Sequence, residues 1–467
     1  MDRFNSDIID RIVGHLPPGH TANWDWLGTA SVLRNAPDER WYISRQWRDA
    51  IERRVFSIVH IESIEGFLSE FESAFAPPRR RAYLRQLHLL VYLAADSCIT
   101  DLAGPVMHCM PCIHPTAVCQ ILTALPNLQS LTLNLKQPSR RVCLLRKKHR
   151  LALADGLRTL SLPCLQTLRL ALGDGDPKNH SFVACKHENA EDSPGQIDPL
   201  SDALRIFTQS CPLLKEVVLS DGKLSPVLFH NPRTVANDTQ TWPALESLTI
   251  TMRGNLLAPN GAWYFTGEEQ QPQDEVAPHN DGYKFANCDA PWWLRIARHF
   301  SGVTSNLDDG EPDLGLSLHE PVAEFDKFVG DAPLNEWRTR PDPVVFDALA
   351  QSMMEAVNHS MPKLHSLRFE IASKHDAVPL AGVRIECLDT GTSTKMSPDG
   401  EEKGETRGEG KNEMVAETSA YGQRRCHIWL GHNTRWAMPG GVAGSCKEWV
   451  GEKGTVLLEE WQDLVQL

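Results

Sequence analysis

Hydrophobic residues in the middle of the chain recur in a short phrase, Pro-x-Leu-x-x-Leu-x-Leu, which predicts a turn followed by a strand. The last two leucines are two residues apart, so both side chains lie on one side of an extended strand. Proline ends the preceding helix and is excluded from strand interiors, so it marks the boundary. Full copies, some with other apolar residues, span 125–133, 162–170, 211–219, 242–250 and 361–369, and a looser copy spans 83–89.

The segments that lead into several copies carry apolar residues at helical spacing, namely 115–125, 199–209 and 343–359. In the last segment Asp342 is a candidate cap and Pro343 suits a first helical turn. One copy of the phrase buries about three large apolar side chains and cannot close a core, whereas stacked copies share one. We therefore predict an α/β fold, in which an irregular right-handed solenoid carries a parallel sheet on its concave side.

A different apolar pattern lies at the N-terminus and predicts a short amphipathic helix that ends at Pro17-Pro18-Gly19. A helix of this length is not stable alone, so it must pack on its neighbours, on a partner, or on both. Its apolar face consists of Phe4, Ile8, Ile9, Ile12, Val13 and Leu16.

This helix, together with Ser44-Arg45-Gln46-Trp47 further on, resembles an F-box. Phe4 and Asp7 stand where the F-box pattern has Leu and Glu, and Asn5 departs from its usual Pro. Residues 49–56 are similar to the exit helix of fungal F-box proteins. Residues 33–42 form an insert between the two halves, either a surface loop or a gene-model error. The alternative interpretation is a generic helical hairpin in an unrelated protein.

The repeated phrase resembles the strand segment of leucine-rich repeats. Together the two resemblances imply a substrate-recognition subunit of a ubiquitin ligase. The F-box would bind the Skp-type adaptor of a cullin–RING ligase, and the repeats would bind a protein substrate. The protein would then act by holding the substrate close to the site of ubiquitin transfer, without catalysing a reaction itself. The adaptor contacts implied are Phe4, Ile8, Ile9, Ile12, Leu16 and Trp47, some of which must also form the F-box's own core.

Residues between the inward-facing leucines of each strand are the candidate substrate contacts. They are mostly small and polar without a dominant charge, which favours a protein partner over a nucleic acid. The alternative is that much of this face is merely solvated. The selected candidates are Thr132, Arg169, Glu216, Thr249 and Arg368.

Composition predicts where the chain divides into domains and which kinds of partner it does not bind. We expect an F-box-like helical domain over 1–56, the irregular repeats over 57–388, a disordered low-complexity segment over 389–420, and a cap over 421–467 with a strand at 427–430 and a helix at 456–465. The net charge of −13 argues against nucleic-acid or membrane-surface binding. No apolar run approaches a membrane span and no signal peptide is expected, so the predicted location is cytoplasmic, nuclear or both.

The sequence contains few candidate metal-binding or catalytic residues. Cys109 and Cys112, flanked by His108 and His114, form only half of a zinc motif, and no second Cys-x-x-Cys exists. No catalytic grouping emerges, and 404–411 departs from a phosphate-binding loop in spacing. We therefore expect no metal, no cofactor and no enzyme activity. The runner-up function is a leucine-rich-repeat interaction scaffold without a ubiquitin-ligase role.

Overall fold

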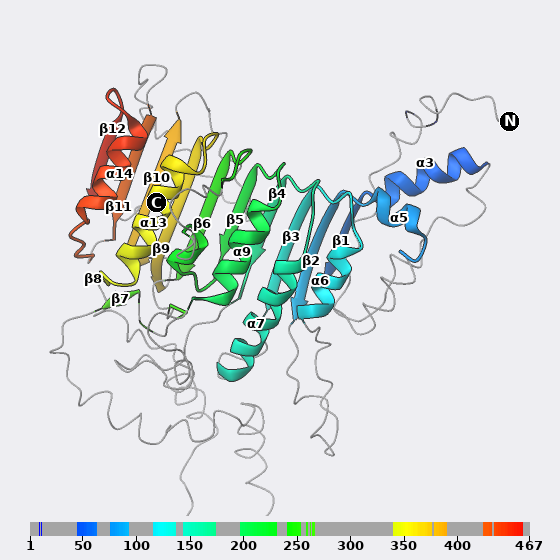
Figure 1. Ribbon diagram of the computed structural model, residues 1–467, viewed down its shortest axis with the longest axis horizontal. Coiled ribbons are helices and arrows are strands. Elements are labelled where there is room, and N and C mark those ends of the chain that lie inside the picture. Colours follow the sequence, from blue (N-terminus) through cyan, green and yellow to red (C-terminus); the bar gives the residue numbers. More distant parts are fainter. Residues whose placement is uncertain are drawn as a thin grey trace, which may run out of the picture.

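Among the residues that the structure describes, ten strands form one sheet, and their order across the sheet is their order in the sequence (Figure 1). The computed structural model describes residues 9, 11, 44–62, 75–92, 115–136, 143–173, 197–230, 241–253, 258–259, 262, 264–266, 340–375, 378–389, 424–431 and 434–460. The strands are β1 (Ile58–Glu62), β2 (Gln86–Tyr92), β3 (Ser130–Lys136), β4 (Thr167–Ala171), β5 (Glu216–Ser220), β6 (Ser247–Arg253), β9 (Ser366–His375), β10 (Val378–Asp389), β11 (Arg424–Leu430) and β12 (Thr455–Glu460).

Most of the sheet is parallel, as the repeated phrase predicts. Strands β1 to β6 and β9 pair in parallel, β10 is antiparallel to both β9 and β11, and β12 is parallel to β11. A separate two-stranded ribbon joins β7 (Phe265–Thr266) to β8 (Arg340–Pro341). The fold class is therefore mixed α/β with a large, mostly parallel sheet.

Helices form a layer on one face of the sheet (Figure 1). α6 contacts α7, α7 contacts α9, the 3₁₀ turn η3 contacts α9 and α13, and α13 contacts α14. α3 and α5 lie at the β1 end (Figure 1). The bounds are α3 (Arg45–Val55), α5 (Pro78–Tyr83), α6 (Pro115–Thr123), α7 (Cys143–Thr159), α9 (Pro199–Gln209), η3 (Pro226–Leu228), α13 (Phe346–His359) and α14 (Gly440–Val450).

The copies of the phrase adopt the same local geometry. In each full copy the first leucine's N–H donates to the carbonyl three residues earlier, as from Leu128 to Leu125 at 3.3 Å and from Leu364 to Met361 at 3.1 Å. At the start of β3, two successive N–H groups both donate to the Arg85 carbonyl. At the start of β9, two successive N–H groups both donate to the Glu246 carbonyl, and in each case the acceptor belongs to the preceding copy. Successive copies are thus geometrically equivalent units that share a continuous backbone hydrogen-bond network.

The core lies between the sheet and the helix layer. The two strand leucines of each phrase are buried, as at Leu131 and Leu133, where 2% and 3% of the surface remains exposed. The predicted stripe on α13 is also core, since Phe346, Leu349 and Met353 are fully buried. Among the described residues, no helix is long and apolar enough to cross a membrane.

One predicted helix starts later than expected and another is wrong. The helix predicted over 343–359 is α13, which begins at Phe346 after a turn. Asp342 acts as the predicted cap of that turn, since its carboxylate accepts hydrogen bonds from Val344 N–H and Val345 N–H. The helix predicted over 456–465 is wrong over its described part, since 455–460 is strand β12, paired with β11. The predicted strand at 427–430 is confirmed within β11, and α14 was not anticipated.

The predicted domain divisions lie only partly within the described residues. The predicted disordered segment 389–420 lies outside them except for Asp389, which ends β10. The C-terminal strands β11 and β12 continue the same sheet rather than standing apart from it. The insert 33–42 also lies outside the described residues.

Candidate binding face

The sheet has an outer face, formed by the strand side chains that point away from the helix layer. Because successive strand residues alternate between faces, residues aligned with Thr132 in the register share this face. That row brings together residues that are far apart in the sequence, and the described residues place no helix over it (Figure 1). The row runs His60, His88, Thr132, Arg169, Val218, Thr249, Arg368, Glu386, His427, Leu457.

The predicted substrate contacts therefore do lie on one face. Thr132, Arg169, Thr249 and Arg368 occupy this row, and Glu216 belongs to the adjacent row two residues earlier. Arg169 Nη2 lies 3.0 Å from Glu216 Oε1, with both side chains partly exposed. Such exposed pairs contribute little stability, so both groups remain available to a partner.

The C-terminal part of the outer face carries a charged and aromatic cluster, formed by Arg368, Glu370, Arg384, His427 and Trp429. Only 5% of Glu370 is exposed. Its Oε2 lies 2.8 Å from Arg368 Nη2 and 3.2 Å from Arg384 Nε. The Arg384 guanidinium lies 5.5 Å from the centre of the Trp429 ring, and the His427 ring stacks on Trp429 at 3.7 Å. Tryptophan and arginine held in this way are typical anchors of protein interfaces.

A second cluster lies toward the N-terminal end of the same face. The rings of His60 and His88 stack with their centres 4.2 Å apart. Burial lowers the pKa of His88, and the nearby charges of His60 and Arg169 lower it further. At neutral pH His88 is consequently an uncharged hydrogen-bonding group rather than a cation.

The sequence pattern contained part of the signal for these clusters. His88 stands between the two leucines of the looser copy at 83–89, the position that Thr132 occupies in its own copy. Arg384 and Trp429 belong to β10 and β11, which lack the phrase, and they meet only through antiparallel strand pairing. The N-terminal cluster was therefore accessible from the sequence, whereas the C-terminal cluster required the sheet register.

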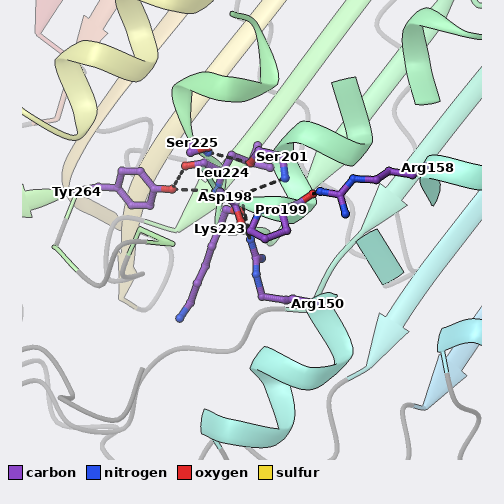
Figure 2. A network of polar contacts seen from close by, with 9 residues as sticks. All are labelled: Arg150, Arg158, Asp198, Pro199, Ser201, Lys223, Leu224, Ser225 and Tyr264. Atoms are coloured by element: carbon purple, nitrogen blue, oxygen red, sulfur yellow. Dashed lines mark hydrogen bonds and ion pairs between the residues drawn. The ribbon is translucent and has the colours of Figure 1, made fainter. Parts of the chain in front are cut away.

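Loops at the carboxyl ends of the strands are held by a polar network (Figure 2). Arg150 of α7 donates to the Asp198 carboxylate at 3.2 Å and to the Lys223 carbonyl at 3.0 Å. Asp198 also caps α9 by accepting from Ser201 N–H at 3.0 Å. The Tyr264 hydroxyl accepts from Leu224 N–H at 2.9 Å and donates to the Leu224 carbonyl.

This network joins elements that come from four separate parts of the chain. It links α7, the start of α9, the loop after β5 and the segment after β6. We interpret this network, called the brace below, as the set of contacts that fixes the spacing of the repeats. Its hydrogen bonds hold the start of α9 against α7 and against the loop after β5.

The described sheet contains no topological switch point of the kind that binds nucleotides. Nucleotide-binding α/β sheets place their ligand where the strand order reverses, at a topological switch point. The ten described strands follow sequence order and contain no such reversal. Within the described residues, no group of three His, Cys, Asp or Glu side chains is arranged to hold a metal ion. The half zinc motif at 108–114 lies outside the described residues.

The predicted adaptor contacts are only partly described. Ser44 caps α3, its hydroxyl accepting from Trp47 N–H at 3.4 Å, so the Ser-Arg-x-Trp segment is a helix start. Ile9, in helical conformation, has 1% of its surface exposed and packs with Ala50 and Ile51, and the partly buried Trp47 packs against these residues. Ile9 thus belongs to an internal core. Phe4, Ile8, Ile12 and Leu16 lie outside the described residues.

No protein family profile, curated protein or solved structure matches this chain.

Proposed function

We propose that this protein is the substrate-recognition subunit of a Skp–cullin–F-box type ubiquitin ligase. In this proposal the N-terminal helices bind the Skp-type adaptor, and the repeats form an irregular leucine-rich-repeat-like solenoid whose outer face binds a protein substrate. The observation that carries the substrate half is the ladder of equivalent strands with a mixed polar, charged and aromatic outer face.

The attachment of α3 supports a connecting role. Glu52 of α3 is fully buried, and its carboxylate accepts hydrogen bonds from Arg79 at 2.7 Å and Arg80 at 3.0 Å at the start of α5. The rings of Phe56 and Phe75 pack edge to face with centres 5.4 Å apart. A ligase receptor needs a stiff link of this kind, because substrate position relative to the adaptor determines the effective concentration for transfer.

Adaptor binding is tested by measuring the affinity of the purified full chain for a Skp-type adaptor. We expect Ile8→Asp and Ile12→Asp to weaken binding by about ten-fold or more, as for buried interface anchors. Arg11→Asp, an exposed position of the same helix, is the matched control and should leave binding nearly unchanged. Failure of the wild-type chain to bind would refute the ligase role.

Substrate binding is tested separately by proximity labelling with wild-type and Trp429→Ala chains. The variant should lose protein neighbours while retaining adaptor binding, because β11 and α3 lie at opposite ends of the sheet (Figure 1). An unchanged set of neighbours would remove the outer face from the proposal.

A scaffold without a ligase role is the second candidate. The burial of Ile9 against α3 favours it, because an apolar residue turned inward is not available to an adaptor. The adaptor-binding measurement separates the two functions.

A further inference from the structure

The last strand, β12, is an edge strand with apolar side chains exposed on both faces of the sheet. Among the described strands it has a neighbour on one side only, namely β11. Leu457 lies on the outer face and is 39% exposed, whereas Leu458 points toward the helix side and is 55% exposed. A strand that presents leucines on both faces is poorly suited to being a solvated edge.

Protein edge strands normally carry features that prevent pairing with another chain, such as charged side chains, proline or a bulge. β12 reads Thr-Val-Leu-Leu-Glu-Glu, so its charges are confined to the two glutamates at its end and it contains no proline. Its register with β11 runs from Thr455 to Glu460 without a shift, so no bulge turns the edge away. Within the described residues, the backbone from Thr455 to Leu458 consequently carries none of these features and offers a template for a further strand.

We propose that β12 pairs with β12 of a second copy of this chain, forming an antiparallel two-fold dimer across the sheet edge. A two-fold axis perpendicular to the sheet keeps each face on its own side, so opposed residues must belong to the same face. An added strand covers both Leu457 and Leu458 at once, which a partner bound to one face of the sheet does not do.

The sequence of β12 is complementary to itself in one register, with Leu457 on the two-fold axis. In this register the two Leu457 side chains meet on the outer face, and Val456 opposes Leu458 of the second copy on the helix side. Thr455 opposes Glu459, whose side chain is 53% exposed, so the carboxylates do not face each other. A register centred on Leu458 would instead place Leu457 against Glu459, which is less favourable.

The dimer is tested by light scattering of the full chain over a concentration series. We expect a reversible dimer for wild type, and a dissociation constant raised about ten-fold or more by Leu457→Lys, because two ammonium groups would then oppose each other at the axis. Leu151→Lys on α7 is the matched control, since Leu151 is also 39% exposed, and it should leave the dimer intact.

The register is tested by cross-linking. Directly opposed residues of antiparallel strands have Cα atoms at a separation that suits a disulfide. With oxidised glutathione as the oxidant, two Leu457→Cys thiols form one intermolecular disulfide while one glutathione disulfide is reduced to two thiols. Leu458→Cys should cross-link far less, and the wild-type chain reports any contribution of the native cysteines.

A chain that stays monomeric throughout the series, and whose Leu457→Cys variant does not cross-link, would overturn the inference. A dimer unaffected by Leu457→Lys would place the interface elsewhere and overturn it too. Preferential cross-linking of Leu458→Cys would overturn the register.

Discussion

The carboxylate of Glu52, inside α3, lies 2.7 Å from the Arg79 guanidinium at the start of α5. Glu52 is fully buried, and Arg80 provides a second guanidinium 3.0 Å away. Burial alone would raise the pKa of Glu52, but hydrogen bonds and charges from the two arginines outweigh it and hold the pKa below its ordinary value. This ion-pair cluster joins α3 directly to α5.

Replacing Glu52 by Gln should therefore destabilise the protein. The substitution removes the negative charge between two arginines and should lower the free energy of unfolding by about 2 kcal/mol, measured by chemical denaturation. Glu216→Gln is the matched control, because Glu216 pairs with one arginine on the outer face and is 31% exposed. Its cost should stay below about 1 kcal/mol. Equal costs for the two variants would contradict the role assigned to Glu52.

The same ion-pair cluster predicts a dependence of stability on pH. Because the folded pKa of Glu52 is lowered, its contribution is fully present above the unfolded pKa, near 4.5, and is lost as the pH falls through the folded pKa. The difference in unfolding free energy between wild type and Glu52→Gln should be constant near neutral pH and narrow below about pH 4.5. Denaturation of both proteins over an acid series measures this, and a constant difference would argue against it.

Gly156 is required by the packing of α7 on α6. A Cβ atom at this position would overlap Sγ of Cys119 and lie 2.8 Å from its Cβ. Glycine to alanine within a helix ordinarily stabilises by about 1 kcal/mol. Here we expect Gly156→Ala to destabilise by about 1–3 kcal/mol through overpacking.

Gly444→Ala in α14 is the control for this substitution. A Cβ at Gly444 meets nothing within 4 Å, so the ordinary stabilisation should appear. Adding Cys119→Ala to Gly156→Ala should recover part of the loss, because it removes the overlapping sulfur. Thermal melts of the four proteins would measure these effects, and similar shifts for the two alanine variants would exclude a specific clash.

The thiols of Cys119 and Cys211 should be unreactive in the folded protein. Burial raises the pKa of each to about 11, so at pH 8 roughly one molecule in a thousand carries the thiolate. Among the cysteines whose burial the structure describes, alkylation mapped by mass spectrometry should modify the half-buried Cys164 first. Both buried thiols should react once denaturant is added. Rapid labelling of Cys119 under native conditions would contradict its place in the core.

The brace around Tyr264 should contribute measurably to stability. Tyr264→Phe leaves the Leu224 N–H and carbonyl without their shared partner in a buried site, which should cost about 1–3 kcal/mol. Tyr83→Phe, at a partly buried position on α5, should change stability by less than about 0.5 kcal/mol. Comparable losses would indicate that the Tyr264 hydroxyl is not structural.

Local sequence patterns were enough to predict the repeating part of this protein. The spacing of prolines and leucines identified β3, β4, β5, β6 and β9, and helical spacing located α6 and α9. It also placed Thr132, Arg169 and Thr249 on one face. These features follow from local backbone geometry, because a strand alternates its side chains and a helix repeats every 3.6 residues whatever lies elsewhere in the chain.

Features that depend on partners distant in the sequence became visible only in the folded arrangement of the strands and helices. Residues 455–460 form a strand because β11 offers an edge, although the segment was expected to be helical. Arg384, Trp429 and Glu370 form one cluster through pairing of β9, β10 and β11, and Ile9 is internal because α3 supplies its contacts. Such contacts join residues far apart in the sequence. The local spacing of apolar residues predicts helices and strands, but it does not specify which distant strand or side chain each of them will contact.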